Sequence, residues 1–323
     1  QKAARPHSEA VEKSNRLWEK LRSEKTAIRW WGTIKLHVLD KIGNLPIEDI
    51  DQRVIHDTLD PIWRKKADTA KKALYRLGAV MKYAAALGHE VNLNAVLLAK
   101  ELLGPQGHVV TSTPSMPWKD IPEFYSSLEE DAVGKIALKL LINLPGPRSK
   151  PIRFLHVGQI DGDVWTVPGR AMKGHKGKVS DWRVPLSPEC LRLIEAAKPY
   201  SREGWLFPAL RDTGVLTRLN MMEVIEAEQG VISDMTMAKV LKNRGLAARP
   251  HGYRSAFSNW TAETRQSLKI AELSNGRTFH TNVQNHYFKT DYLDERREMM
   301  NRWSEHVTGR ANADVIRQDA VRT

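Results

Sequence analysis

The stretch Arg249-Pro-His-Gly-Tyr-Arg254 combines the start of a helix with two cationic side chains. Pro250 suits the first turn of a helix, because its backbone angle matches and its missing N–H has no partner there. His251 and Arg254 are three residues apart, so both lie on one side of that turn, where unpaired N–H groups attract anions. The spacing predicts a phosphate site; a surface His and Arg without a shared role is the alternative. The residues that follow predict the core face of the helix: Tyr253, Ala256, Phe257 and Trp260.

The composition indicates a basic chain large enough for two domains. Lys and Arg number 50 and Asp and Glu 38 among 323 residues, a formal net charge of +12. Because no polybasic tail holds this charge, we expect a polyanionic partner, with nucleic acid first, rather than a membrane anchor. The most apolar stretch, 136–144, is short and contains Lys139, so no membrane span is expected. A single cysteine, Cys190, excludes a disulfide framework and a cysteine-built zinc site and favours a reducing cytoplasm.

The amino-terminal third is helical in pattern. Between residues 64 and 89, apolar side chains recur at steps of three and four and predict a core face: Ala67, Ala70, Leu74, Leu77, Val80, Met81 and Ala84. The opposite face is basic and either is solvated or contacts phosphates: Lys65, Lys66, Lys71, Lys72, Arg76 and Lys82. An earlier helix is predicted to bury Trp30, Trp31, Ile34, Leu36 and Val38.

The middle of the chain predicts a linker followed by a second domain. Residues 104–117 are rich in proline and glycine, which prevents a regular element. Two apolar helices are predicted near 121–128 and 133–144. Residues 164–167 and 182–186 then predict two paired strands with a basic loop between them. The expected fold class is mainly α with a small antiparallel β-sheet or hairpin.

The order of several segments resembles the tyrosine recombinase (phage integrase) family, especially the integrases of prophages and genomic islands. The segments that carry the resemblance are Met116-Pro-Trp-Lys-Asp-Ile-Pro-Glu-Phe124, Leu144-Pro-Gly-Pro-Arg148 running on to Asp161, the hairpin 165–173 leading to 182–187, His251-Gly-Tyr-Arg254, and 286–300 with the sequence HYFKTDYLDERREMM. No single segment is decisive; their shared order and spacing carry the assignment.

The resemblance implies a two-domain clamp around duplex DNA. The expected parts are a tail over 1–7, a helical core-binding domain over 8–103, a linker over 104–117, a catalytic domain over 118–307, and a tail over 308–323 that docks on a neighbouring protomer. A small arm-binding domain is expected to precede Gln1 in the native chain.

The resemblance also assigns the nucleophile. A tyrosine phenol can attack a DNA phosphodiester and keep its energy in a covalent bond. The resemblance assigns the nucleophile to Tyr287, because Tyr287 stands at the family's distance from the Asp-Tyr-Leu-Asp-Glu-Arg-Arg segment at 291–297. Tyr292 is the alternative nucleophile.

The remaining catalytic roles implied by the resemblance concern charge and protons. Arg148 and Arg254 would stabilise the transition-state charge on phosphate, and His251 would bind the phosphate or help move the phenolic proton. The general acid for the leaving 5′ oxygen would be Lys173, with Lys176 and Lys178 as competitors. No metal or other cofactor is implied.

Two departures from the family pattern weaken the expectation of full activity. Pro151 stands where the family has Glu or Asp, three residues after the first arginine. A second His or Trp is also missing from the interval about ten to a dozen residues before the nucleophile; the substitutes considered are Ser274, Asn275 and the nearby imidazole of His280. A catalytically weak or inert DNA-binding relative, acting as an accessory or architectural protein, is therefore the competing hypothesis. A type IB topoisomerase is a third, which the tail 286–300 disfavours.

The expected partners are double-stranded DNA attachment sites, three further copies of the chain in a tetramer, and DNA-bending or directionality proteins. The protein is expected in the bacterial cytoplasm, associated with the nucleoid. Seven side chains are predicted to contact DNA phosphates: Lys71, Lys72, Arg76, Arg170, His175, Lys176 and Lys178. For each of them, a solvated side chain without a DNA contact is an equal alternative.

Overall fold

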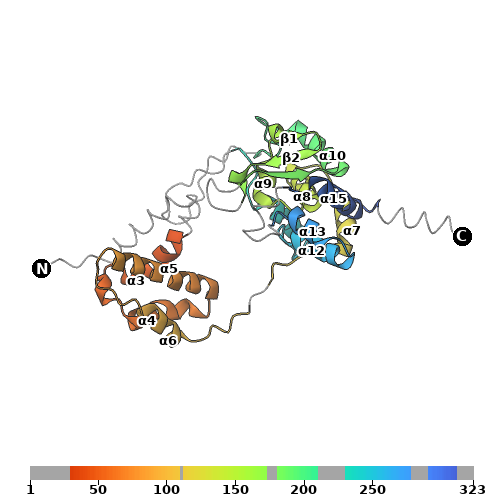
Figure 1. Cartoon of the computed structure of the whole chain (residues 1–323). Helices are drawn as coiled ribbons and strands as arrows, with labels where there is room; N and C mark the ends of the chain where they lie inside the picture. The colour runs from red at the N-terminus through yellow and green to blue at the C-terminus, as the bar shows by residue number, and fades with distance from the viewer. Residues whose placement is uncertain (1–29, 110–111, 173–179, 210–229, 278–289, 311–323) are drawn as a thin grey trace. The chain divides into compact units, whose positions relative to one another are not determined.

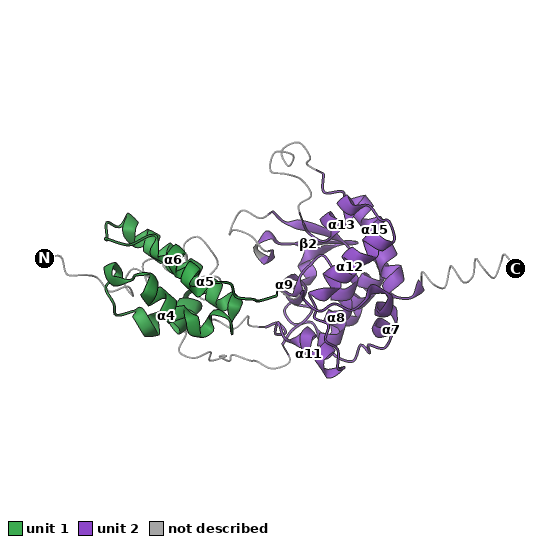
Figure 2. Ribbon diagram, turned by 90° about the horizontal axis from the view of Figure 1, so that it is seen from below, with its two compact units in different colours: residues 1–111 green, residues 112–323 purple. Residues whose placement is uncertain are grey.

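The computed structural model describes residues 30–109, 112–172, 180–209, 230–277 and 290–310. The chain divides into two compact units, Gln1–Thr111 and Ser112–Thr323 (Figures 1 and 2). The start of the stretch 104–117 is fixed to the first unit, because the indole N–H of Trp63 donates to the Gly104 carbonyl at 2.8 Å. Its later part is bonded to the second unit, where the Arg249 N–H donates to the Pro114 carbonyl at 3.1 Å. No helix in the described part of the chain is long and apolar enough to cross a membrane.

The elements that the structure describes in the first unit are helices and helical turns, joined by short loops. After a helical turn at 30–34, its elements are the π-helix η1 (Lys35–Leu39), α3 (Asp40–Ile42), the 3₁₀ turn η2 (Ile47–Asp49), α4 (Gln52–Trp63), α5 (Ala67–Ala86) and α6 (Ala95–Leu103). The Asp51 carboxylate begins α4 by accepting hydrogen bonds from the N–H groups of Arg53 and Val54 at 2.9 and 2.8 Å. Such a cap satisfies donors that a helix start leaves open.

The predicted core of this unit is confirmed except at two positions: Trp31 is only partly buried against the core, and Leu36 is exposed. All seven apolar residues expected to form the core face of 64–89 are buried, on α5. Trp30, Ile34 and Val38 are buried as well, but Leu36 is 62% exposed, so its prediction was wrong. Ile34 and Val38 are four residues apart and share a face, whereas the residue midway between them faces the other way.

The second unit surrounds one buried helix, α8 (Val133–Asn143), which packs against α9, α10, α11 and α15 (Figure 2). Every residue of α8 from Ile136 to Asn143 is buried. The other helices of this unit are α7 (Ile121–Ser126), α9 (Ser149–Arg153), α10 (Pro188–Ala197), α11 (Thr236–Asn243), α12 (Gly252–Glu263), α13 (Leu268–Ser274) and α15 (Leu293–Val307). Short 3₁₀ turns are η3 (Trp118–Asp120), η4 (Val157–Gln159), η5 (Gly169–Ala171) and η6 (Lys198–Tyr200). The predicted helices near 121–128 and 133–144 are confirmed.

A small antiparallel sheet covers one side of this unit. Its strands β1 (Ile160–Asp161), β2 (Val164–Val167) and β3 (Trp182–Pro185) lie in chain order. The predicted pairing is confirmed in a register that places Trp165 opposite Val184. Strand β1 was not predicted, because two residues are too few to show alternation. The fold is thus mainly α with a small antiparallel sheet, as the sequence predicts.

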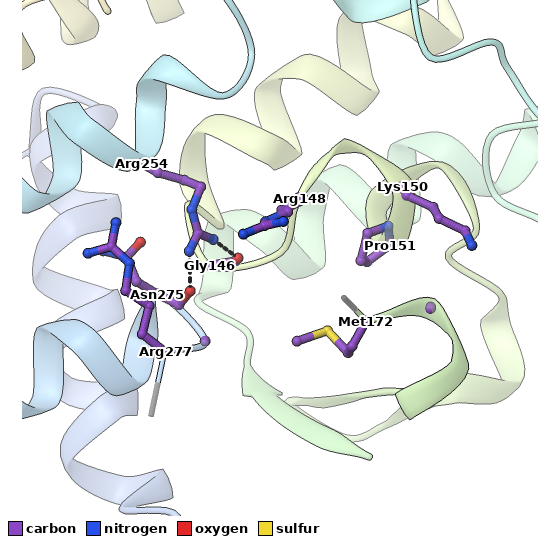
Figure 3. Close-up of a pocket in the computed structure, with 10 residues that line it drawn as sticks. Gly146, Arg148, Lys150, Pro151, Met172, Arg254, Asn275 and Arg277 are labelled. Atoms are coloured by element: carbon purple, nitrogen blue, oxygen red, sulfur yellow. Dashed lines mark hydrogen bonds between the residues drawn. The ribbon is translucent and has the colours of Figure 1, made fainter. Parts of the chain in front are cut away.

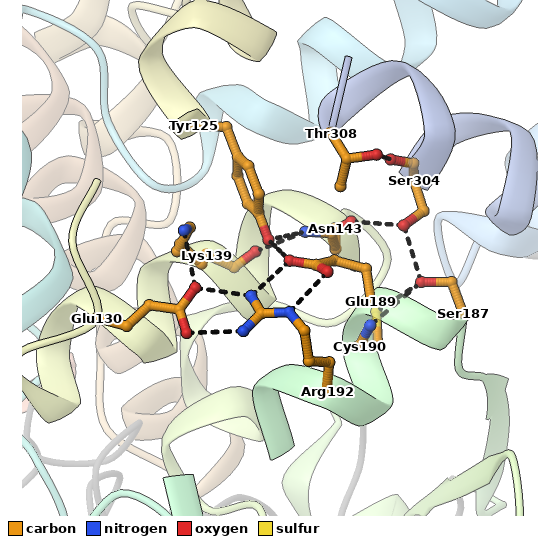
Figure 4. A network of polar contacts seen from close by, with 10 residues as sticks. All are labelled: Tyr125, Glu130, Lys139, Asn143, Ser187, Glu189, Cys190, Arg192, Ser304 and Thr308. Atoms are coloured by element: carbon orange, nitrogen blue, oxygen red, sulfur yellow. Dashed lines mark hydrogen bonds and ion pairs between the residues drawn. The ribbon is translucent and has the colours of Figure 1, made fainter. Parts of the chain in front are cut away.

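A polar network joins α7, α8, α10 and α15 inside the second unit (Figure 4). The Tyr125 hydroxyl donates to Glu189 at 2.6 Å, and Arg192 donates to both Glu189 and Glu130. The Ser304 hydroxyl on α15 donates to the Asn143 side chain at 2.9 Å. Buried polar groups need such partners, and their pairing fixes the helices in one arrangement.

Candidate active site

Arg254 enters the interior of the second unit from the first turns of α12. It lies three residues after His251, which occupies the N-cap position of the helix, and its side chain is only 6% exposed. Gly252 permits this helix start, since a Cβ there would lie 2.5 Å from the Pro114 carbonyl oxygen. The chain at 114–115 therefore crosses directly over the first residues of α12.

The Arg254 guanidinium joins two loops that are distant in the sequence (Figure 3). Its N–H groups donate to the carbonyl oxygens of Pro145, Gly146 and Asn275. The loops are in contact, because a Cβ on Gly146 would lie 2.1 Å from the Ser274 carbonyl oxygen. A guanidinium has five N–H groups, so not all of its donors are used by these carbonyls.

A cavity of about 320 Å³ opens beside this guanidinium (Figure 3). Its lining comes from three segments and α12: Gly146, Arg148, Lys150, Pro151, Ala171, Met172, Arg254, Asn275, Gly276 and Arg277. Four of these residues are cationic, and no carboxylate is among them. The exposed Arg148 side chain makes no hydrogen bond or ion pair with the described residues. The cavity is therefore suited to an anion that offers several oxygens.

The pKa values around the cavity record this concentration of positive charge. Burial, together with the charges of Arg148 and Arg277, lowers the pKa of Arg254 to about 10. Partial loss of hydration and the charges of Arg254, Arg148 and Arg277 lower the pKa of His251. At neutral pH the guanidinium stays charged and the imidazole is neutral, so the imidazole can accept a proton.

The structure brings several of the sequence-predicted residues together. Arg148, Arg254 and Asn275 line one cavity, and His251 is close enough for the charges of Arg148 and Arg254 to act on it. Ser274 is buried directly before Asn275 and is not in the cavity lining. Pro151 lies in the cavity wall, so the wall holds an apolar ring where the family pattern has a carboxylate.

Other predicted residues lie elsewhere. Outside the described residues are Lys173, His175, Lys176, Lys178, His280 and Tyr287, and the side chain of Arg170. In the first unit, Lys71 and Lys72 are exposed on α5, whereas Arg76 is half-buried and donates to the Trp30 carbonyl at 2.9 Å. Their contacts with phosphate remain predictions.

The rival tyrosine, Tyr292, has a structural partner. Its hydroxyl accepts a hydrogen bond from the Lys269 ammonium at 2.6 Å, and the same ammonium lies 3.9 Å from the ring centroid. The adjacent Asp291 carboxylate pairs with both ends of the Arg183 guanidinium on β3 at 2.9 and 2.7 Å. The segment that follows the predicted nucleophile is thereby attached to α13 and to the sheet.

Sequence reasoning missed Arg277 and Lys150 as cavity residues. Arg277 precedes Tyr287 by ten residues and so falls in the interval where the family has a second His or Trp. This position could have indicated that Arg277 belongs to the site, but an arginine is neither of the two residue types, His and Trp, that the family pattern has there. Within the described residues, no group of three His, Cys, Asp or Glu side chains could hold a metal ion.

Comparisons with known proteins agree with this fold. The family model for the phage integrase central domain matches residues 7–100. Prophage integrase IntA of Escherichia coli K12 is 23% identical over 295 residues, which are 88% of this chain and 66% of that protein. The integrase of Shigella phage Sf6 is 26% identical over 274 residues, 83% of this chain and 66% of that protein.

Solved integrase structures share the fold. A lambda integrase tetramer bound to a Holliday junction gives a TM-score of 0.63 at 14% identity, covering 88% of this chain and 78% of that chain. The Tn1549 transposon integrase in complex with circular intermediate DNA gives a TM-score of 0.59 at 14% identity. The match covers 91% of this chain and 99% of that chain. The fold is thus that of the DNA-bound tyrosine recombinases.

The matched central domain, the sequence relatives and the solved structures of the same fold are all those of phage integrases, or tyrosine recombinases, to which this chain is similar. The chain spans 66% of the length of the first curated relatives that it matches.

Proposed function

We propose that this chain is a site-specific DNA recombinase, an integrase that cuts and rejoins DNA to integrate or excise a mobile element. The observation that supports this most is the cavity in which Arg148 and Arg254 meet without a carboxylate in its lining. Guanidiniums remain charged and can each bond two oxygens of one phosphate. The cavity is therefore suited to a scissile DNA phosphate.

In the proposed reaction, the phenol oxygen of Tyr287 attacks the scissile phosphorus as its proton leaves, and neutral His251 can accept that proton. The bond from phosphorus to the deoxyribose 5′ oxygen breaks, and Lys173 protonates this oxygen, which leaves a 5′ hydroxyl. Arg148 and Arg254 stabilise the added charge on the non-bridging oxygens. A 5′ hydroxyl of the partner duplex then attacks the phosphorus of the 3′-phosphotyrosyl group and gives its proton to the neutral amine of Lys173. The bond from phosphorus to the Tyr287 oxygen breaks, His251 returns a proton to the phenolate, and a Holliday junction forms.

The assembly proposed for this reaction has four copies of the chain on two double-stranded attachment sites. The basic face of α5 would contact phosphates in the first unit, through Lys71 and Lys72. Accessory proteins would bend the DNA or set the direction of exchange. Because the substrate is chromosomal and element DNA, we place the protein at the bacterial nucleoid.

Covalent trapping tests this proposal. The full chain is mixed with a nicked suicide duplex that carries the end of its element, and DNA-linked protein is sought on a denaturing gel. We expect an adduct with the wild type and none with Tyr287→Phe. Tyr292→Phe is the matched control and should keep the adduct, because that hydroxyl is bonded to Lys269.

A second candidate function, an inert DNA-binding relative, is favoured by one observation. Pro151 occupies the cavity wall, and no carboxylate orients Arg148 within the described residues. Tight, salt-dependent binding to the same duplex without any adduct would support this candidate and contradict the enzyme.

A further inference from the structure

Arg277 adds a third arginine to the cavity lining, and the end of α13 sets its place. The N–H of Gly276 donates to the Leu273 carbonyl at 2.9 Å, and the N–H of Arg277 donates to the Glu272 carbonyl at 3.0 Å. Gly276 has a φ of +64°. These bonds and this backbone angle form a Schellman motif, in which the residue after the glycine leaves the helix in a fixed direction. The motif therefore presents Arg277 at the cavity edge.

The only ion pair that Arg277 makes with described residues is weak and open to solvent. Its Nη1 lies 2.7 Å from Glu272 Oε1, and the two side chains are 50% and 34% exposed. Exposed ion pairs contribute little to stability, because water screens them and the side chains lose freedom. An incoming phosphate can therefore replace Glu272 at low cost.

The charges of the cavity favour that replacement. Arg277 adds to the positive charge of Arg148, Lys150 and Arg254 in one lining, and its charge contributes to the lowered pKa of Arg254 and of His251. Like charges held together raise the energy of the unliganded state, and an anion among them relieves it. Glu272 reduces this repulsion when no ligand is present.

We propose that Arg277 is a catalytic residue, whose guanidinium leaves Glu272 and donates to a non-bridging oxygen of the scissile phosphate beside Arg148 and Arg254. The proposal rests on the proposed strand-cleavage function. It changes no bond in that reaction: Arg277 only adds hydrogen-bond donors to the oxygens that gain charge in the transition state. Glu272 is its counter-ion in the free protein.

Single-turnover cleavage of the suicide duplex tests the proposal. Arg277→Ala should lower the cleavage rate about a hundredfold, as for the loss of one transition-state donor elsewhere, while duplex affinity changes far less. The backbone N–H that completes the Schellman motif remains in this variant. Arg302→Ala is the matched control, because Arg302 is also exposed and paired with a glutamate, Glu298, but lies outside the cavity lining. Equal rates for the two variants would overturn the proposal.

Binding of inorganic phosphate separates this proposal from the proposed function. The wild type and Arg302→Ala should bind phosphate equally in calorimetry, and Arg277→Ala about tenfold more weakly, as for the loss of one charged hydrogen bond. If the wild type forms no covalent adduct, the proposed function fails, and the phosphate titration still decides on Arg277. Equal phosphate affinity in both variants would contradict its role, whatever the cleavage assay shows.

Discussion

Arg254 shows how one side chain can join parts of a chain that are distant in sequence. Its guanidinium is the common donor for carbonyls of two loops that also form the cavity wall. Lysine has the same charge but a single nitrogen, so it cannot span these carbonyls. The residue type is therefore set by the fold as well as by the chemistry.

For Arg254→Lys we expect a loss of about 2–4 kcal/mol in the free energy of unfolding, because buried carbonyls lose charged donors. Urea unfolding followed by circular dichroism measures this. Arg265→Lys is the control, since Arg265 is exposed and such surface changes stay within about 0.5 kcal/mol. Equal stability of the two variants would show that the carbonyl contacts contribute nothing.

His251 should report the presence of an anion through its pKa. In the free protein, loss of hydration and the charges of Arg254, Arg148 and Arg277 keep this pKa below 6.5. A bound phosphate offsets those charges and favours the imidazolium, so the pKa of His251 should rise when inorganic phosphate or a duplex is added. An NMR titration of the imidazole protons measures the change.

His306 is the internal control for this titration. Its pKa is lowered by burial, and the bond to the Trp118 carbonyl opposes this; no arginine contributes. Phosphate should leave the pKa of His306 unchanged. A parallel shift of both imidazoles would mean a general salt effect and would argue against an anion at the cavity.

At the scale of an element, the end of α13 packs closely against the Trp182 side chain of the sheet. Gly276 has a positive φ, and a Cβ on it would lie 3.1 Å from the Trp182 ring of β3. The same ring lies under the Arg296 guanidinium of α15, at 5.3 Å from its centroid. Trp182 therefore connects the cavity wall with the helix that follows the predicted nucleophile.

Gly276→Ala should cost more stability than the same change at Gly245. Both glycines have positive φ, which costs an alanine about 1–2 kcal/mol, but Gly245 has open space where the Cβ would go. We expect the excess loss in Gly276→Ala, measured by thermal unfolding, to come from the Trp182 contact. Phosphate affinity should fall only in Gly276→Ala. Equal losses at both positions would contradict the contact.

The polar network of Figure 4 predicts a pH-dependent contribution from Glu130. Hydrogen bonds from Arg192, and then from Lys139, outweigh burial and lower the pKa of Glu130 from 4.5 to about 2. A lowered folded-state pKa means that the stabilisation is present above pH 4.5 and is lost as the pH falls toward 2. Glu130→Gln should therefore be less stable than the wild type at pH 7, with the difference shrinking below pH 4.5.

Urea unfolding at pH 7 and pH 3 tests this. Glu129→Gln is the matched control, because Glu129 is an exposed carboxylate that pairs with Lys135. Its substitution should change stability little at either pH. A stability difference for Glu130→Gln that is the same at both pH values would contradict the assigned cause.

Local patterns predicted the elements well and the contacts between elements poorly. Helix α5 and the β2–β3 pair could be predicted, because spacing of apolar residues depends only on neighbours in the chain. The bond of Tyr125 to Glu189 and that of Trp303 to the Ile142 carbonyl join distant positions, and no local signal encodes them. The site follows the same rule: the spacing of His251 and Arg254 is a local signal, and Arg148 came from a motif resemblance, whereas Arg277 required knowledge of which loops touch.

For the whole molecule, the net charge of +12 predicts that duplex binding weakens steeply with salt. Each lysine that contacts a phosphate releases counter-ions, so the logarithm of affinity falls by about 0.9 per contact and per tenfold rise in salt. The slope therefore counts phosphate contacts, and it can distinguish a solvated basic face of α5 from one that holds DNA.

The double variant Lys71→Gln, Lys72→Gln should lower that slope by about 2 if both side chains contact phosphates, and weaken binding similarly for specific and unrelated duplexes. Lys239→Gln with Lys242→Gln is the control of equal charge change, on exposed positions of α11. Fluorescence anisotropy across a salt series measures both slopes. If the two variants change the slope equally, the effect belongs to net charge alone, and the basic face of α5 is only solvated. If the α5 variant alone changes it, the first unit contacts DNA directly through this face.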